Sequence, residues 1–127
     1  MTRAITLALL LAVAGCAQYD PGGNVHEYMA RMHEPRVITG TCASACVLYL
    51  TSPRTCYAPD ARFVFHGVTR AATGEYDAAG SRVFAARFWP EMRAHLTEVD
   101  ALRSPDHYYT MTGAQVAALD TVERICG

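Results

Sequence analysis

The segment Thr41-Cys42-Ala43-Ser44-Ala45-Cys46, with the apolar run that follows it at residues 47–50, decides the fold of this chain. A short β-branched strand at residues 36–39 precedes it and is closed by Gly40. Because the run after Ser44 has no polar face, it predicts a buried helix that opens near this serine. A strand, a tight turn and a buried helix in succession are typical of layered α/β proteins.

Strands and helices alternate along the rest of the chain, which favours an α/β fold with short parallel strands flanked by helices. An amphipathic helix is expected at residues 83–99, broken or kinked by Pro90. The polar, glycine-containing segment 67–80 is expected to be a mobile loop that acts as a lid or specificity segment. The other expected elements are a helix at residues 25–33 ended by Pro35, strands at residues 56–57, 62–66 and 121–126, and helix starts at Ser104-Pro105 and at Thr112 with Gln115.

The N-terminus has the pattern of a signal peptide. Arg3 supplies a positive charge, residues 5–13 are an apolar run, and Ala14 and Gly15 are small. The run is too short to span a bilayer, which needs ~20 apolar residues. The alternative is that residues 5–13 are a buried strand of the domain itself.

The four residues Val13-Ala14-Gly15-Cys16 also resemble the lipobox of bacterial lipoproteins. The resemblance implies cleavage before Cys16 and a lipid on its sulfur, which makes the membrane a partner through this anchor. Ala17, which follows the cysteine, implies the periplasmic side of the outer membrane. Residues 1–15 are then a signal peptide of the lipoprotein type, and residues 16–127 form a single small domain.

Composition excludes some classes of function. The formal net charge is −1, so electrostatics indicate neither nucleic acid nor an acidic partner. The sequence contains no lysine, and therefore no mechanism can use a lysine base. We expect no cofactor and no metal.

Four cysteines follow Cys16, and an even number in a small exported domain predicts disulfides. Three pairings are possible; short separation favours Cys46 with Cys56 and leaves Cys42 for Cys126. A zinc site of Cys42, Cys46, Cys56 and His66 is an alternative, but its spacings lack the paired short loops of structural zinc modules. Free-thiol chemistry at Cys42 or Cys46 is another.

Three features with catalytic chemistry follow in order: Pro21-Gly22-Gly23 before a helix, Ser44 at a helix start, and His66 at a strand end. A serine hydroxyl becomes a good nucleophile when a neighbouring base takes its proton, and histidine titrates near neutral pH. Glycines allow backbone amides to point at an oxyanion. Each feature also has a structural interpretation: Ser44 as an ordinary N-cap, His66 as a packing residue and the glycines as a turn.

This order resembles the Clp protease proteolytic subunit and its crotonase-fold relatives over residues 20–67. The resemblance implies a minimal crotonase-like (Clp-protease-like) core with Ser44 as nucleophile and His66 as base. It further implies oxyanion donors at Gly22, Gly23 and Ala45, and an acidic third member at Asp106, with Asp100 as a second candidate.

The resemblance predicts an exported, membrane-anchored serine hydrolase that acts on a peptide or another acyl substrate. The alternative is a non-catalytic lipoprotein that keeps a degenerate form of the fold as a binding or scaffold module. The family's fold begins with further strands before the Gly-Gly turn, which this chain lacks. A core reduced in this way leaves a sheet edge exposed, and an exposed edge predicts self-association into a homo-oligomer.

Overall fold

The computed structural model describes residues 19–127. The expected signal peptide, the alternative strand at residues 5–13 and the lipidation site Cys16 lie outside the described residues. The described elements are β1 (Tyr19–Asp20), α2 (Val25–Ala30), β2 (Arg36–Ile38), β3 (Thr41–Ala43), the 3₁₀ helix η1 (Ser44–Thr51), β4 (Thr55–Tyr57), β5 (Arg62–Phe65), α3 (Ala78–Ala85), α4 (Pro90–Glu98), β6 (Tyr109–Thr112) and α5 (Gly113–Leu119). Within residues 19–127, no helix is long and apolar enough to cross a membrane.

The strands form two sheets. The larger sheet has the order β1-β3-β5-β6, in which β1, β3 and β5 are parallel and β6 runs antiparallel to β5. The smaller sheet is the parallel pair β2-β4. The mixed α/β class is therefore confirmed, and the expected parallel pairing holds for all strands except β6.

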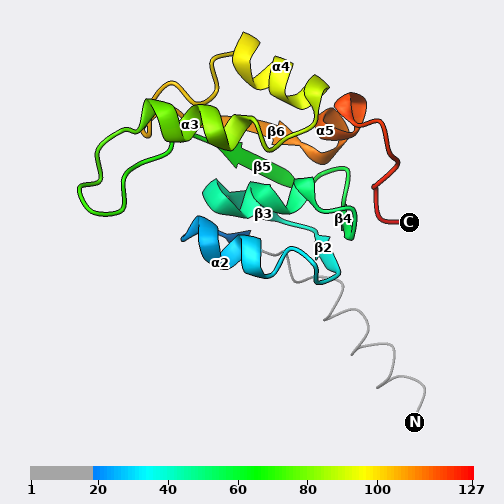
Figure 1. Cartoon of the computed structure of the whole chain (residues 1–127). Helices are drawn as coiled ribbons and strands as arrows, with labels where there is room; N and C mark the ends of the chain where they lie inside the picture. The colour runs from blue at the N-terminus through cyan, green and yellow to red at the C-terminus, as the bar shows by residue number, and fades with distance from the viewer. Residues whose placement is uncertain (1–18) are drawn as a thin grey trace.

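One face of the larger sheet is buried. Side chains alternate between the two faces of a strand, so Cys42 of β3 and Phe63 and Phe65 of β5 share one face, and all three are buried. The helix η1, which is buried from Ala45 to Leu50 as its uniformly apolar sequence predicts, is joined to this face by the Cys42–Cys46 disulfide. On the same face, Phe65 packs edge-on against Phe88, with ring centroids 5.8 Å apart. Figure 1 shows η1 and α2 towards the β3 end of the sheet, and α3 and α4 towards the β6 end.

Several expected elements are present. The amphipathic region divides as predicted, because α4 begins at Pro90, whose missing N–H is tolerated in the first turn of a helix. At Thr112, the side chain accepts from the amide of Gln115 while the Gln115 side chain accepts from the amide of Thr112, which completes a capping box for α5.

Two expected elements are wrong. No helix begins at Ser104-Pro105; instead Ser104 accepts a hydrogen bond from the Gly67 amide (2.8 Å) and the chain turns into β6, which was not expected. The closing strand at residues 121–126 is reduced to a single bridge between Ile125 and Tyr57. Tertiary contacts override local propensity in both segments.

A buried ion pair shapes the C-terminal segment. The Arg124 guanidinium lies 2.7 Å from the Asp120 carboxylate, and both side chains are almost fully buried. The same guanidinium donates to the carbonyl oxygens of Leu50 and Ser52 and lies over the Trp89 ring. These contacts bend residues 120–124 around the end of η1, so the segment does not extend along a neighbouring strand.

The disulfide pairing favoured by short sequence separation is wrong. The structure joins Cys42 to Cys46 and Cys56 to Cys126. Cys56 belongs to β4, where the bridge between its neighbour Tyr57 and Ile125 brings Cys126 alongside. In the chain-entropy account, closing loops with separations of 4 and 70 residues contributes about 2 and about 4 kcal/mol respectively. The Cys56–Cys126 bond is therefore the larger contributor to global stability.

Tyr57 is fully buried in the hydrophobic core. Burial first, and then the negative charge of Asp120, raises the pKa of Tyr57 to about 12. An unfolded tyrosine loses its proton near pH 10. The folded state therefore holds this proton more tightly, and the resulting stabilisation is complete below pH 10 and disappears as the pH rises from 10 towards 12.

Replacing Tyr57 with Phe should remove this alkaline sensitivity. Between about pH 9 and about pH 11, the free energy of unfolding of the wild-type chain should fall by about 1.4 kcal/mol more than that of Tyr57→Phe. Urea unfolding followed by circular dichroism measures both, and no lysine titrates in this interval. The matched control is Tyr19→Phe, which alters an exposed tyrosine and should keep the wild-type slope. Equal slopes for all three chains would contradict the prediction.

Candidate active site

A small pocket brings together the residues singled out in the sequence. Ser44, Ala45 and Gly23 line one part of it, and His66 lines another, in a space of about 90 Å³. Apolar and small residues complete its wall: Val25, Phe65, Gly67, Val68, Thr69 and Phe84. Residues as far apart in the sequence as Gly23 and Phe84 therefore meet at the end of β3 and β5, where the strands lead into η1 and the following loop.

Ser44 has an unusual backbone conformation. Its φ angle is +58°, in the left-handed region that non-glycine residues seldom adopt. It lies where β3 ends and η1 begins, which is the strand–turn–helix geometry of a nucleophile elbow. The interpretation of Ser44 as an N-cap is wrong, because the cap of η1 is Ala43 and has no side-chain hydrogen bond. A strained residue in a pocket suggests a functional role.

The Gly-Gly turn packs directly against Ser44. Gly22 has φ +85°, and a Cβ atom at this position would lie 2.5 Å from the carbonyl oxygen of Ala43 and 2.6 Å from Cβ of Ser44. It would also lie 2.9 Å from the amide nitrogen of Ala45. Only glycine can bring its backbone this close in this conformation.

The amides near Ser44 are not equivalent. The Gly22 amide donates to Oδ1 of Asp20 at 2.9 Å. Within residues 19–127, no acceptor takes the amides of Gly23 or Ala45, and both residues line the pocket with Ser44. Of the three expected oxyanion donors, Gly23 and Ala45 are therefore available, whereas Gly22 is used to shape the turn.

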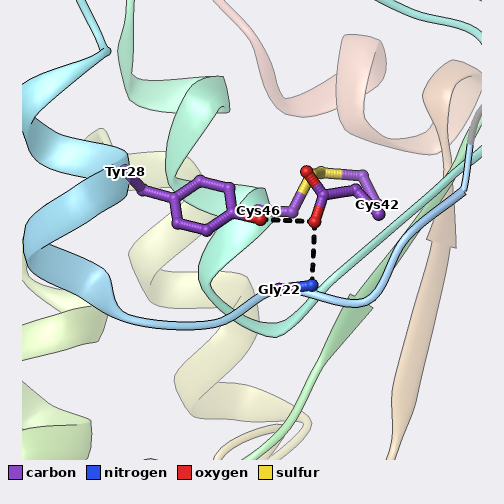
Figure 2. Close-up of a disulfide and its surroundings, with 5 residues drawn as sticks. Gly22, Tyr28, Cys42 and Cys46 are labelled. Carbon is purple, nitrogen blue, oxygen red and sulfur yellow. Dashed lines mark hydrogen bonds between the residues drawn. A yellow bond between two sulfur atoms is a disulfide. The ribbon is translucent and has the colours of Figure 1, made fainter.

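Asp20 and Tyr28 hold this turn in place. Oδ1 of Asp20 accepts hydrogen bonds from both the Gly22 amide and the Tyr28 hydroxyl, as Figure 2 shows for the labelled donors. Tyr28 is buried, and this burial, followed by the hydrogen bond to Asp20, strongly raises its pKa. Sequence reasoning did not include either residue in the site. An Asp two residues before a turn glycine is a typical Asx-turn signal, whereas nothing in the local sequence marks Tyr28.

His66 follows the last residue of β5 and is half-buried. Its Nδ1 lies 2.9 Å from the carbonyl oxygen of Gly67. Because a carbonyl can only accept, Nδ1 carries the proton and Nε2 of the neutral ring keeps a lone pair. The ring also packs edge-on against Tyr108, with centroids 5.6 Å apart. Tyr108, which was not among the expected site residues, is therefore a neighbour of the candidate base.

Neither of the expected acidic residues lines this pocket. Asp106 is exposed, and its amide donates to Oγ of Ser104. Asp100 follows α4, has φ +53° and lines a different cavity. In the described part of the chain, no hydrogen bond or ion pair connects either carboxylate to His66, and none connects Ser44 Oγ to the His66 ring. The structure therefore assembles Ser44, His66 and the glycine turn without a third member.

The alternatives based on cysteine chemistry are wrong. Cys42, Cys46, Cys56 and Cys126 are all disulfide-bonded, so they supply neither zinc ligands nor a free thiol at Cys42 or Cys46. Over residues 19–127, no group of three or more histidine, cysteine or acidic side chains could hold a metal ion.

Alanine substitutions at the two positions of the glycine turn should have different effects on stability. Gly22→Ala should destabilise the protein by at least ~2 kcal/mol, because the new Cβ meets backbone atoms and the positive φ is unfavourable for alanine. The matched control is Gly23→Ala, where a Cβ would find its nearest neighbour 3.9 Å away, at the Tyr28 ring. It should change the midpoint of chemical unfolding little. Equal destabilisation by both substitutions would contradict the described packing.

No protein-family model matches the chain, and no curated protein matches it either. The chemical interpretation of the pocket therefore depends on the residues and geometry described above.

Proposed function

We propose that this protein is a serine hydrolase in which Ser44 is the nucleophile and His66 is the general base. The observation that carries the proposal is the left-handed backbone of Ser44 at a strand–helix junction, in a pocket that it shares with His66. A left-handed backbone at a residue other than glycine costs roughly 1–3 kcal/mol, and such strain is concentrated at functional sites.

The proposed reaction proceeds through an acyl-enzyme intermediate on Ser44. Oγ of Ser44 attacks the carbonyl carbon of an acyl substrate, and its proton passes to Nε2 of His66. The negative charge that develops on the substrate oxygen is stabilised by the amides of Gly23 and Ala45. The leaving group departs with the proton from His66, and water then attacks the acyl-enzyme by the same route in reverse.

The pocket restricts what can bind next to Ser44. Its volume of about 90 Å³ corresponds to roughly three water molecules. Val25, Phe65 and Phe84 contribute an apolar wall. These features support a small group beside the reacting carbonyl, with the rest of a peptide or other acyl substrate outside the pocket.

The same proposal includes the fold family, the cellular location and self-association. The order of glycine turn, nucleophile and base supports a minimal crotonase-like core, since the turn follows β1, Ser44 follows β3 and His66 follows β5 in adjacent strands of one sheet. Two disulfides are compatible with an oxidising compartment such as the periplasm. The lipobox-like segment at residues 13–16 supports anchoring to the outer membrane, and self-association remains part of the proposal.

One observation favours the non-catalytic alternative. Nδ1 of His66 donates to the Gly67 carbonyl, at the ring position where a catalytic carboxylate would orient the imidazole. A binding or scaffold module with this fold would keep the pocket and lose the acid. The experiment below distinguishes the two functions.

A fluorophosphonate probe should label the wild-type chain covalently at Ser44. Ser44→Ala should abolish labelling because the nucleophile is lost, and His66→Gln should slow it about 10²-fold or more because the base is lost. Intact-mass spectrometry with peptide mapping measures both results. His26→Gln alters an exposed histidine whose side chain makes no described contact with the pocket, and it should label at the wild-type rate.

Absence of labelling in the wild-type chain, with normal folding of all variants by circular dichroism, would support the binding module and reject the hydrolase. Labelling that persists in Ser44→Ala would show that another nucleophile reacts.

A further inference from the structure

The Cys42–Cys46 disulfide encloses the candidate nucleophile. It closes a ring of five residues with Ser44 at the centre, and the two Cα atoms lie 5.3 Å apart. In a continuous strand, the same four steps along the chain would span ~13 Å. The bond therefore requires a sharp change of direction between Cys42 and Cys46, and the left-handed φ of Ser44 lies at its midpoint.

Other contacts fix the two ends of this ring. On the N-terminal side, β3 pairs with both β1 and β5. On the C-terminal side, η1 is buried from Ala45 onward. Ser44 itself makes no side-chain hydrogen bond within the described residues, so its conformation is imposed by its surroundings. A serine without such restraint prefers the right-handed or extended region.

The disulfide also lies beside the parts that shape the turn. Figure 2 shows the Cys42–Cys46 bond next to Gly22 and Tyr28, and both cysteines are buried. The glycine turn, which tolerates no Cβ against Ser44, and the cysteine ring therefore restrict the same residue from two sides. Since so short a loop adds less to global stability than the Cys56–Cys126 loop, the main effect of the Cys42–Cys46 bond is local.

We propose that the Cys42–Cys46 disulfide is a positioning element that holds Ser44 in its left-handed conformation, so that the pocket becomes reactive only in the oxidised chain. The effect of the disulfide on reactivity rests on the proposed function, whereas its effect on the backbone conformation of Ser44 does not. In the oxidation, the two thiols lose two protons and two electrons to a partner disulfide, which is released as two thiols. Before oxidation, and thus before arrival in an oxidising compartment, the hydrolase would be inactive.

The first test compares two matched disulfide deletions in the full chain. Cys42→Ala/Cys46→Ala should lose the strong intraresidue amide–Hα nuclear Overhauser effect that a positive φ produces at Ser44, while Cys56→Ala/Cys126→Ala should keep it. Fluorophosphonate labelling should slow about tenfold or more in the first variant and little in the second. Thermal unfolding should show the opposite order, with the larger loss of stability in Cys56→Ala/Cys126→Ala.

A double-mutant cycle keeps the inference testable if either deletion folds poorly. Ser44→Gly introduces a residue that adopts positive φ without strain. Its effect on the free energy of unfolding should be more favourable in the oxidised wild-type background than in Cys42→Ala/Cys46→Ala, where Ser44 relaxes. Comparing the two backgrounds removes the contribution of glycine to the unfolded chain.

The outcomes separate the two proposals. An unchanged Overhauser effect at Ser44 in Cys42→Ala/Cys46→Ala, or equal effects of Ser44→Gly in the two backgrounds, would overturn the positioning role. Equal labelling of the two disulfide variants, with wild-type labelling intact, would overturn the link to reactivity. Absence of labelling in the wild-type chain rejects the hydrolase alone, because the Overhauser effect still decides the positioning role.

Discussion

The left-handed backbone at Ser44 is the constraint on which the candidate site depends. It ends β3 and turns the chain at once into η1, so that a strand paired on both sides is followed directly by a buried helix. The close approach of Gly22 is possible because this position lacks a Cβ atom. Gly23 and Ala45 then line the pocket together with the serine. Each of these arrangements would change if Ser44 adopted an ordinary helical conformation.

Hydrogen bonds connect this junction to the rest of the molecule. Asp20 uses one carboxylate oxygen to hold both Tyr28 of α2 and the backbone of Gly22. On the other side of the pocket, the Gly67 amide donates to Ser104, and the Tyr76 hydroxyl donates to Leu102. The segment after His66 is therefore tied to the chain that precedes β6. The expected loop at residues 67–80 is shorter than predicted, because α3 already begins at Ala78.

Local chemistry was sufficient to predict part of this structure. Pro90, the capping pair Thr112 and Gln115, and the uniformly apolar run after Ser44 each carry their information within a few residues, and the corresponding helices are present. Ser44, His66 and the glycine turn were found because each follows a recognisable strand or precedes a helix, and the structure brings them to one pocket. The strand β6, in contrast, depends on pairing with β5, which is distant in the sequence.

The failures have the same physical origin. The pairing of Cys56 with Cys126 follows from the bridge between Tyr57 and Ile125, which joins segments about seventy residues apart. The C-terminal segment is bent by the hydrogen bond from Arg124 to the carbonyl oxygen of Ser52, 72 residues away along the chain. Neither contact leaves a periodic pattern in the sequence. Side-chain interactions over such separations are specified by the folded state as a whole.

The long disulfide also determines how the chain would respond to proteolysis. The turn at residues 70–74 projects from the body of the molecule in Figure 1, and Gly74 has open space around it. This exposed turn lies inside the loop closed by Cys56 and Cys126. A protease that cuts there would leave the two fragments covalently joined, and mass spectrometry would record the addition of one water molecule. Cleavage at this exposed turn would therefore leave the protein in one piece until its disulfide is reduced.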